Sequence, residues 1–248
     1  MNEGSPADLP DDWSVSFFDD GFAATFGQMG RYDSTADEVD EIASLLGLPP
    51  GARILDVPCG FGRHAGPLDA CGYEVVGIDM APAQIEEARR RWPGIEFSVG
   101  DMRQPPEGPF DAVLNLWSSF GLLPSAEEDL QALAAWRRVL APGGSLLMHL
   151  TTLERAQLRY RRGDELVSVN TAEVGGVLEE THCDWSTGVI HMRYTRPGWS
   201  RESRMRLYSE AGLCRALLES GFRDVRLTGG FAGAPVASGG RAVVLART

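Results

Sequence analysis

Short apolar runs alternate with longer helix-like segments through the middle of the chain. The runs have six or seven residues each and lie at 52–57, 74–79, 95–101, 111–117 and 144–150. Helix candidates fill the intervals, and the one at 125–140 opens with Ser125 and Glu128 at the spacing of a capping box. Continuous apolar strands separated by helices predict a parallel sheet that has helices on both faces.

The last third of the chain changes character. Residues 177–195 indicate two strands joined near 186–188, either a hairpin or part of a small meander. Residues 207–222 indicate a helix with Ser209 as its N-cap, and 224–231 and 241–248 indicate two closing strands. We therefore predict an α/β fold with a Rossmann-like, seven-stranded, mostly parallel sheet and a small antiparallel β lid insertion.

The predicted organisation has four parts. They are an N-terminal lid or cap segment at 1–35, a core at 36–150, a lid insertion with a β-hairpin at 151–206, and the C-terminal part of the core at 207–248. The first part carries an aromatic stripe at near-helical spacing: Trp13, Phe17, Phe18, Phe22 and Phe26. Such a stripe indicates either core packing or a lid over a binding site, and the sequence does not separate the two.

Composition narrows the classes of function. The 248 residues are 43% hydrophobic and 23% charged, with a net charge of −12, and all 23 basic residues are Arg. A chain this acidic repels nucleic acid and anionic membrane surfaces, so we expect a small-molecule partner, no nucleic acid and no membrane. The four cysteines form no CxxC pair, and the acidic N-terminus lacks a signal-like apolar stretch. We therefore expect no metal site, reduced thiols and a cytoplasmic location.

The charge is unevenly placed. Residues 1–50 hold 11 acidic side chains and one Arg. Two stretches of the predicted insertion, 155–162 and 193–206, hold nine Arg between them. These clusters either bind an anionic acceptor or dock the acidic N-terminal segment over the site, and we favour docking because it accounts for both features.

A glycine loop follows the first predicted strand. Gly60 and Gly62 allow a ligand to approach the backbone, and Asp79, 19 residues after Gly60, ends the second strand where it can accept hydrogen bonds from a ribose diol. GFGRHA also matches the dinucleotide fingerprint G-x-G-x-x-G/A. Asp56 argues against a dinucleotide, because this acid would face a pyrophosphate, whereas it suits a ligand with ammonium and sulfonium groups. Asp101 ends the third strand and can accept from an adenine amino group.

These segments resemble the class I S-adenosylmethionine-dependent methyltransferases. The resembling motifs are ILDVPCGFGRH, VVGIDMAPAQIEEAR, FSVGDMRQ, LNLWSSFG and RRVLAPGGSLLM. The segment RYDSTADEVDEI and the SSFG stretch are most similar to the small-molecule subgroup, which includes sugar and antibiotic N-methyltransferases. Pro58 departs from the family, which more often has Gly there, so one backbone donor of the loop is missing.

The resemblance implies a role for individual residues. For the cofactor S-adenosyl-L-methionine it implies Tyr32, Asp56, Pro58, Cys59, Gly60, Gly62, Asp79, Met80, Asp101, Met102, Leu116 and Trp117. We expect Asn115, Ser118, Ser119 and His149 near the substrate, with His149 and Tyr32 as catalytic candidates. Structural alternatives are open: His149 can simply bond a loop, the serines can cap a helix, and Met80, Met102 and Trp117 can be core residues.

The expected function is methyl transfer to a nitrogen or oxygen of a small molecule, with an anionic or aromatic acceptor and a setting in secondary metabolism. A cyclisation or another non-methylating reaction on the same fold is the alternative, and an NAD(P)-dependent oxidoreductase is a weaker one. We expect a monomer or a homodimer.

Overall fold

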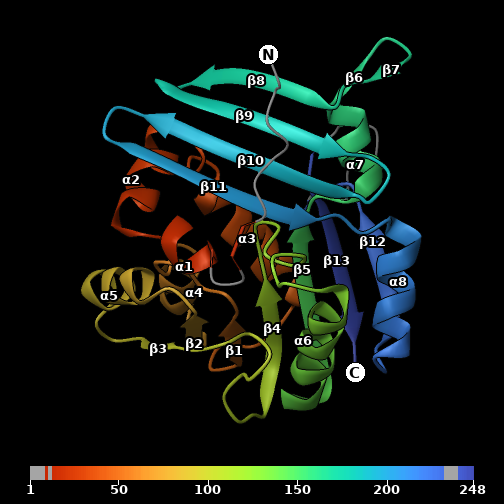
Figure 1. The fold of residues 1–248 in the computed structure, drawn as a ribbon. Coiled ribbons are helices and arrows are strands. Elements are labelled where there is room, and N and C mark those ends of the chain that lie inside the picture. The colour runs from red at the N-terminus through yellow and green to blue at the C-terminus, as the bar shows by residue number, and fades with distance from the viewer. Residues whose placement is uncertain (1–8, 11–12, 232–239) are drawn as a thin grey trace.

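The structure is a computed structural model that describes residues 9–10, 13–231 and 240–248. Its centre is a seven-stranded sheet in the order β12-β13-β5-β4-β1-β2-β3 (Figure 1). The strands are β1 (Arg53–Asp56), β2 (Glu74–Asp79), β3 (Glu96–Val99), β4 (Phe110–Asn115), β5 (Leu140–Leu150), β12 (Arg223–Thr228) and β13 (Ala242–Arg247). Pairs from β3 across to β5 are parallel, and β13 is reversed against both of its neighbours. The predicted Rossmann-like, mostly parallel sheet is confirmed.

Helices cover both faces of this sheet. One face packs on α3 (Thr35–Leu46), α4 (Ala65–Ala70) and α5 (Pro82–Arg91), and the other on α6 (Ala126–Val139) and α8 (Glu210–Glu219). Successive side chains of β5 alternate between the two cores, with Leu146 and Met148 in one and Leu147 in the other. A strand that is buried on both faces needs apolar residues at every position, which explains the continuous apolar runs of the sequence.

Two helices begin at the predicted caps. Ser125 Oγ accepts a hydrogen bond from the Glu128 amide at 3.2 Å, and the Glu128 carboxylate accepts from the Ser125 amide at 3.0 Å, so the capping box of α6 is complete. Ser209 Oγ accepts from the Gly212 amide at 3.0 Å at the start of α8. Local polar side chains therefore determine where both helices start.

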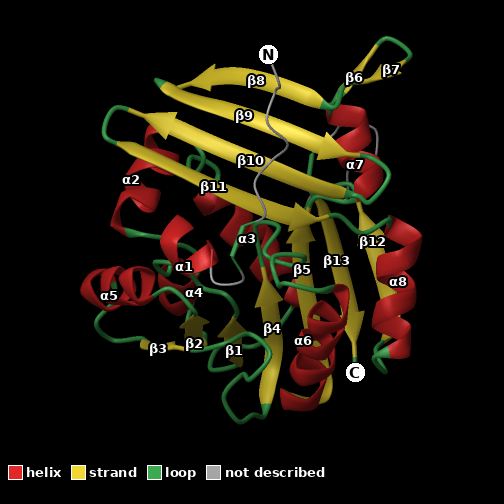
Figure 2. Cartoon of the chain, in the orientation of Figure 1, coloured by secondary structure: helices red, strands yellow, loops and turns green. Residues whose placement is uncertain are grey.

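A second sheet spreads beyond the carboxyl ends of the central strands (Figures 1 and 2). It is an antiparallel meander in the order β11-β10-β9-β8, which we call the lid sheet. Its strands are β8 (Val169–Val174), β9 (Val177–Asp184), β10 (Val189–Arg196) and β11 (Trp199–Arg206). Between β5 and the lid sheet come α7 (Leu153–Arg159) and a small hairpin of β6 (Arg161–Arg162) and β7 (Glu165–Leu166). The meander interpretation is correct, but the two outer strands were missed, because polar side chains dominate β11 and β8 has no fully buried residue.

The N-terminal segment lies between the lid sheet and the central sheet. Its helices are α1 (Trp13–Phe17) and α2 (Asp20–Gln28), which together with the turn between them we call the cap. Four residues of the aromatic stripe are buried against Val177, Tyr194 and Trp199 of the lid sheet. The stripe is therefore both packed core and cover. Within the described ranges, no helix is long and apolar enough to cross a membrane.

Candidate active site

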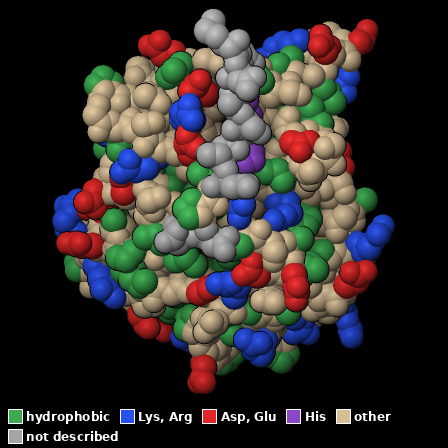
Figure 3. All heavy atoms as spheres, in the orientation of Figure 1, with side chains coloured by type: hydrophobic (Ala, Val, Ile, Leu, Met, Phe, Trp, Pro, Cys, Tyr) green, Lys and Arg blue, Asp and Glu red, His purple; other side chains and the backbone are tan. Residues whose placement is uncertain are grey.

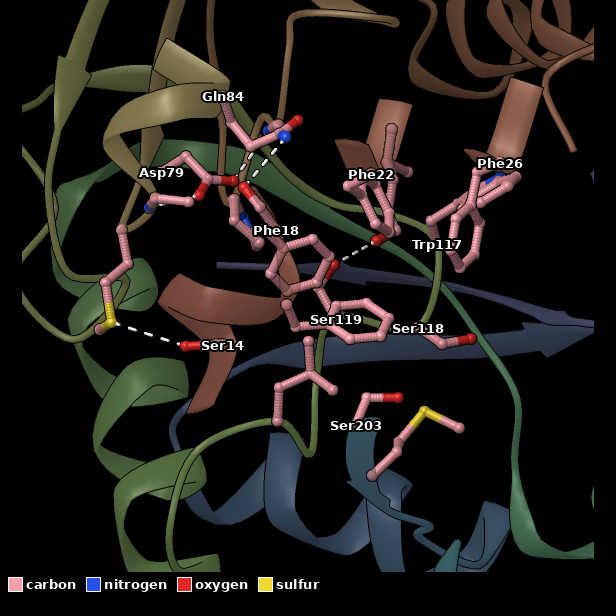
Figure 4. A pocket seen from close by; sticks show the side chains of 18 of the residues that line it. Ser14, Phe18, Phe22, Phe26, Asp79, Gln84, Trp117, Ser118, Ser119 and Ser203 are labelled. Carbon is pink, nitrogen blue, oxygen red and sulfur yellow. Dashed lines mark hydrogen bonds between the residues drawn. The ribbon is translucent and has the colours of Figure 1, made fainter. Parts of the chain in front are cut away.

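A cavity lies where three parts of the fold meet. Its floor is the carboxyl edge of β1, β2 and β4, its roof is the inner face of the lid sheet, and the cap closes one side (Figure 4). From β1 the strands are added toward one edge of the sheet as β2 and β3, and then toward the other edge as β4 and β5, so β1 and β4 flank the topological switch point. Ligands of open α/β sheets bind in the crevice at this point. Asp79 and Gln84 lie at one end of the view, and Ser118 and Ser203 lie at the other.

Most of the predicted site residues line this cavity. They are Tyr32, Pro58, Cys59, Gly60, Asp79, Met80, Met102, Leu116, Trp117, Ser118 and Ser119. Five others do not reach its wall: Asp56, Gly62, Asp101, Asn115 and His149. The structure thus gathers residues from five separate segments into one site, while the other five predicted residues do not form part of the wall.

The glycine loop connects β1 to α4, and its two glycines have different surroundings. Both have positive φ, +54° at Gly60 and +74° at Gly62. Gly60 borders the cavity, where an added Cβ would meet nothing closer than Gln84 Oε1 at 3.7 Å. At Gly62 a Cβ would lie 2.9 Å from both Phe97 and Trp92. The close approach expected at Gly62 is therefore to packed aromatic rings and not to a ligand.

Replacing Gly62 with Ala is expected to destabilise the fold by about 1–3 kcal/mol, since both backbone strain and overpacking contribute. Gly143→Ala is the matched control, because Gly143 has φ +81° and an added Cβ there meets nothing within 4 Å. Urea unfolding of both variants separates the two effects. Equal losses in the two variants would mean that the contact with Phe97 and Trp92 is unimportant.

Two buried carboxyl groups stand at the carboxyl ends of β1 and β2. Asp79 accepts hydrogen bonds from the amides of Gly60 and Ala81, both at 2.9 Å, yet burial raises its pKa to about 6. Asp56 lies just beneath the loop, and its Oδ2 atom is buried without a hydrogen-bond partner among the described residues. Burial raises the pKa of Asp56 to about 8. A buried carboxyl with an unsatisfied oxygen favours a cationic neighbour.

These groups fit S-adenosylmethionine. Each Asp79 oxygen already accepts one backbone bond and retains lone pairs for the hydroxyls of a ribose. Asp56 is a buried acid next to the residues that line the wall, so a bound ammonium group would stabilise its charged form. Met80 and Met102 provide apolar sulfur-containing surface on the same side of the cavity.

Asp101 is not available as expected. Its carboxylate accepts hydrogen bonds from Arg103 Nε at 2.9 and 3.0 Å and from the Arg103 amide at 2.8 Å, and Arg103 also pairs with Glu128. The neighbours Gly100 and Met102 line the cavity instead. The Asp101 carboxylate is thus held by an arginine two residues further along the chain and stands outside the cavity wall, and its adenine contact stays a prediction.

Trp117 and Ser118 form a strained corner of the cavity. Both have positive φ, 62° and 65°, which is unusual for residues other than glycine. The Ser118 amide donates to the His149 carbonyl oxygen at 2.8 Å, and Ser118 Oγ accepts from the Thr151 amide at 2.9 Å. Surrounding bonds thus hold the strain in place at the site. The nearest following helix, α6, begins at Ala126, so the helix-capping alternative for the serines is wrong.

The side chains of Asn115 and His149 contact other parts of the protein and not the cavity. Asn115 Nδ2 donates to the Val57 carbonyl oxygen at 2.8 Å and so links β4 to the glycine loop. The His149 ring lies 4.5 Å from the ring of Phe231, and burial lowers its pKa to about 3. Because neither side chain reaches the cavity wall, the structure does not support the predicted substrate contacts or the general-base role of His149.

Tyr32 is placed as predicted, beside the glycine loop. Its ring centroid lies 5.2 Å from that of Phe61 and 5.5 Å from that of Trp117. Its hydroxyl is buried without a partner in the described structure, and burial raises its pKa above the usual range. Tyr32 therefore enters the site as a neutral hydrogen-bonding group.

Sequence reasoning missed a network of charged groups next to Tyr32. Glu38 of α3 accepts from Arg63 at 2.9 Å and lies 2.8 Å from His64 Nε2. The Arg63 guanidinium lies 4.5 Å from the Trp117 ring centroid, and that of Arg241 lies 4.6 Å from the same centroid. The pairs are far apart in the sequence, so no spacing could reveal them.

The Arg clusters have several partners. Arg201 pairs with Asp19 and donates to the Ser16 carbonyl oxygen at 2.8 Å, which docks the lid sheet on the cap. Arg155, Arg206 and Arg193 pair instead with Glu210, Asp129 and Glu202. The acidic residues Glu3, Asp8, Asp11 and Asp12 lie outside the described residues. Docking is thus observed for Arg201, whereas several other members of the clusters have structural partners.

The fold and the glycine-loop site together define the class of S-adenosylmethionine-binding methyltransferases. Residues 54–144 match the family described as a methyltransferase domain. A solved structure of an S-adenosylmethionine-dependent methyltransferase from Clostridium acetobutylicum superimposes with a TM-score of 0.75 at 15% identity, over 91% of this chain and 97% of that one. This likeness establishes the shared fold.

Three relatives are similar in sequence. The demethylmenaquinone methyltransferase of Renibacterium salmoninarum is 34% identical over 52% of this chain and 58% of its own length. The dTDP-3-amino-3,4,6-trideoxy-alpha-D-glucopyranose N,N-dimethyltransferase of Streptomyces venezuelae is 32% identical over 48% and 52%. The chain therefore spans about half the length of these two relatives. The ubiquinone biosynthesis O-methyltransferase of Alkalilimnicola ehrlichii is 30% identical over 73% of this chain and 72% of its own length. The chain belongs to the S-adenosylmethionine-dependent methyltransferase family.

Proposed function

We propose that the protein transfers a methyl group from S-adenosylmethionine to a nitrogen or oxygen atom of a small molecule. The observation that carries this proposal is one cavity that joins Asp79 and the glycine loop to a second, roofed end under the lid sheet. One end fits the cofactor, and the other has room for an acceptor. The relatives include both an N,N-dimethyltransferase and an O-methyltransferase, which supports either acceptor atom.

When bound, S-adenosylmethionine supplies an activated methyl group on a sulfonium. In this chain Asp79 and the Gly60 backbone would hold the ribose side, while Asp56 would stabilise the ammonium group. Leu116 and Trp117 line the cavity and would border the reacting centre. The cap and the lid sheet would exclude water and align the acceptor. Alignment of the acceptor with the methyl group is the main contribution of the protein to methyl transfer.

The titratable groups of the wall favour an acceptor that needs no strong base. His64 is bonded to Glu38, and burial lowers its pKa to about 4, so it is a weak base. Glu179 is paired with Arg31. Within the described cavity wall, an amine acceptor that is already a nucleophile fits these surroundings better than a hydroxyl that must be deprotonated.

The surface and the thiols support the remaining assignments. The face shown in Figure 3 intersperses acidic and basic side chains without the basic stripe expected of a nucleic-acid-binding surface. The cysteines are free, as in the reducing cytoplasm, where we place the protein. A setting in secondary metabolism, and a monomer or homodimer, are part of the same proposal.

Calorimetry tests the cofactor assignment. S-adenosylhomocysteine should bind with measurable heat and NAD should not. Asp79→Ala should weaken S-adenosylhomocysteine binding by about 1.5–3 kcal/mol, because charge-assisted hydrogen bonds are lost. Since Asp79 also accepts from two backbone amides, circular dichroism must show that the variant is folded. Binding of equal strength by wild type and folded variant would remove Asp79 from the site.

The reaction is tested with S-adenosylmethionine and a metabolite extract. Products heavier by one CH₂ group support methyl transfer. Consumption of S-adenosylmethionine without such products would favour cyclisation or another non-methylating reaction.

A further inference from the structure

The acceptor end of the cavity carries more positive than negative charge. Four arginines line the cavity, namely Arg31, Arg63, Arg159 and Arg241. Two of them have acidic partners, Glu179 for Arg31 and Glu38 for Arg63. Neither Arg159 nor Arg241 has an ion pair within the described part of the chain. Arg159 is exposed, whereas Arg241 is largely buried. A buried guanidinium cannot neutralise itself by losing a proton, so an anion beside Arg241 would be favoured.

We propose that the acceptor is an anionic small molecule whose carboxylate or phosphate group binds Arg241, with Arg159 as a second cationic contact. This inference rests on the proposed function, because it assigns the other end of the cavity to the cofactor.

Of Arg241 and Arg159, Arg241 has the more fully described contacts. It lies directly before β13, and its Nε donates to Ser118 Oγ at 3.2 Å while its guanidinium lies 4.6 Å from the Trp117 ring centroid. These contacts leave the terminal nitrogens without a protein acceptor among the described residues and fix the plane of the group. Burial, together with the charges of Arg159, Arg63 and Arg31, lowers its pKa to about 10 against the opposing effect of Glu38, so it stays charged at neutral pH. A planar guanidinium held by one edge offers its other edge for bidentate binding of an anion.

Arg241 and Arg63 both lie against the Trp117 ring, but they enter the cavity from different strands. Arg63 follows the glycine loop after β1, and a carboxylate bound beside that loop would meet Arg63 first. Arg241 enters from β13, which is separated from β1 by β5 and β4 in the sheet order. It therefore approaches from the side of the lid sheet and α7, where Arg159 also lies.

The rest of this end is apolar. The inner face of the lid sheet contributes Ile190, Met192, Tyr194 and Met205, and the cap contributes Phe22 and Phe26. Ser203 Oγ is buried there without a partner among the described residues. An acceptor with an aromatic or lipophilic body and one anionic group matches both the walls and the charge.

The test uses the full chain saturated with S-adenosylhomocysteine and three probes: benzoate, phenyl phosphate and benzamide, the neutral counterpart of benzoate. Calorimetry or ligand-observed NMR should show that benzoate or phenyl phosphate binds at least about tenfold more tightly than benzamide. Arg241→Gln should remove that preference and leave the Kd of S-adenosylhomocysteine within about twofold. Which of the two anions binds better identifies the anionic group.

Two further variants make the result specific. Arg193→Gln is the matched control, because Arg193 lies on β10 between the inward residues Met192 and Tyr194 and pairs with Glu202 at the surface. It should leave all three probes unchanged. Arg241→Lys keeps the charge but loses the planar group, so an intermediate benzoate affinity is expected.

Three outcomes would overturn the inference. They are equal binding of benzoate and benzamide, an unchanged benzoate preference in folded Arg241→Gln, or an equal loss of S-adenosylhomocysteine affinity in that variant, which would assign Arg241 to the cofactor. The same probes are titrated without S-adenosylhomocysteine. If wild type does not bind S-adenosylhomocysteine, the proposed function fails, and the titration of the free protein decides separately whether Arg241 selects an anion.

Discussion

Asp56→Asn is expected to weaken S-adenosylhomocysteine binding by about tenfold or more at pH 8 and, at the same pH, to make the protein more stable. The carboxyl of Asp56 is buried with an unsatisfied Oδ2 atom. In the described part of the free protein the Oδ2 atom has no hydrogen-bond partner and Arg63 offsets the burial only in part, whereas a bound ammonium group nearby would stabilise the charge. Loss of roughly 1.4 kcal/mol of such stabilisation corresponds to the tenfold change.

The stability effect has a defined pH window. The folded pKa of Asp56 is about 8 and the unfolded value is that of an ordinary Asp. Between roughly pH 4 and pH 8 the folded state therefore holds a proton that the unfolded state has lost, so stability contributed by this group falls as pH rises. Asn does not titrate. The variant should match wild type near pH 4 and exceed it by more than about 1 kcal/mol at pH 8.

Binding should also be linked to protons. In wild type near pH 7, ligand binding should release protons from Asp56, so affinity should rise with pH up to about pH 8. Calorimetry in buffers of different ionisation enthalpy measures this release, and Asp56→Asn should abolish it. Asp69→Asn is the control, because Asp69 is exposed on α4. A variant that releases as many protons as wild type would show that Asp56 does not respond to the ligand.

The sequence predicted the elements whose determinants are local. The central strands are buried on both faces and therefore appear in the sequence as apolar runs. The hydroxyl groups of the N-cap residues Ser125 and Ser209 accept hydrogen bonds from amides three residues further along the chain. Gly60 and Asp79 were found because the loop and the end of β2 have a fixed spacing. By contrast, β11 alternates buried and polar residues and contains Glu202 and three Arg, so its apolar pattern is weak.

The failures at the site concern where side chains point and what they pair with. Asp101 and Arg103 are neighbours in sequence, yet only the fold brings Glu128 beside Arg103 and completes the ion pairs. His149 lies near the end of the fifth run as predicted, but its ring packs on Phe231 and is not part of the cavity wall. Arg241 follows no motif at all. It reaches the cavity because the reversed strand β13 begins at the carboxyl edge of the sheet.

Phe17→Ala is expected to undock the cap while the central sheet stays folded. The Phe17 ring lies at the centre of the aromatic cluster, with ring centroids 4.9–6.2 Å from those of Trp13, Phe18, Phe22, Phe26 and Tyr194. Removal of a buried Phe side chain costs about 3–5 kcal/mol. Polar contacts also hold the cap, among them Arg201 to Asp19, Arg196 Nε to Thr25 Oγ1 at 2.7 Å and Gln84 Nε2 to the Phe18 carbonyl oxygen at 3.1 Å. Since Phe17 joins most rings of the cluster, a loss of this size should shift the cap toward an open state before the central sheet unfolds.

The expected signs are faster proteolysis within residues 13–31, by about tenfold or more, and faster dissociation of S-adenosylhomocysteine. The second effect is expected at the cofactor end of the site. It follows because Ser14 lies 3.8 Å from the Met80 sulfur and Gln84 ties the cap to the start of α5, both at the cofactor end. Phe120→Ala is the control, because Phe120 is buried in the central core and should lower the stability of the whole fold. If Phe17→Ala instead unfolds cooperatively like Phe120→Ala, with no early cleavage in residues 13–31, the cap is a fixed part of the core and not a separate cover.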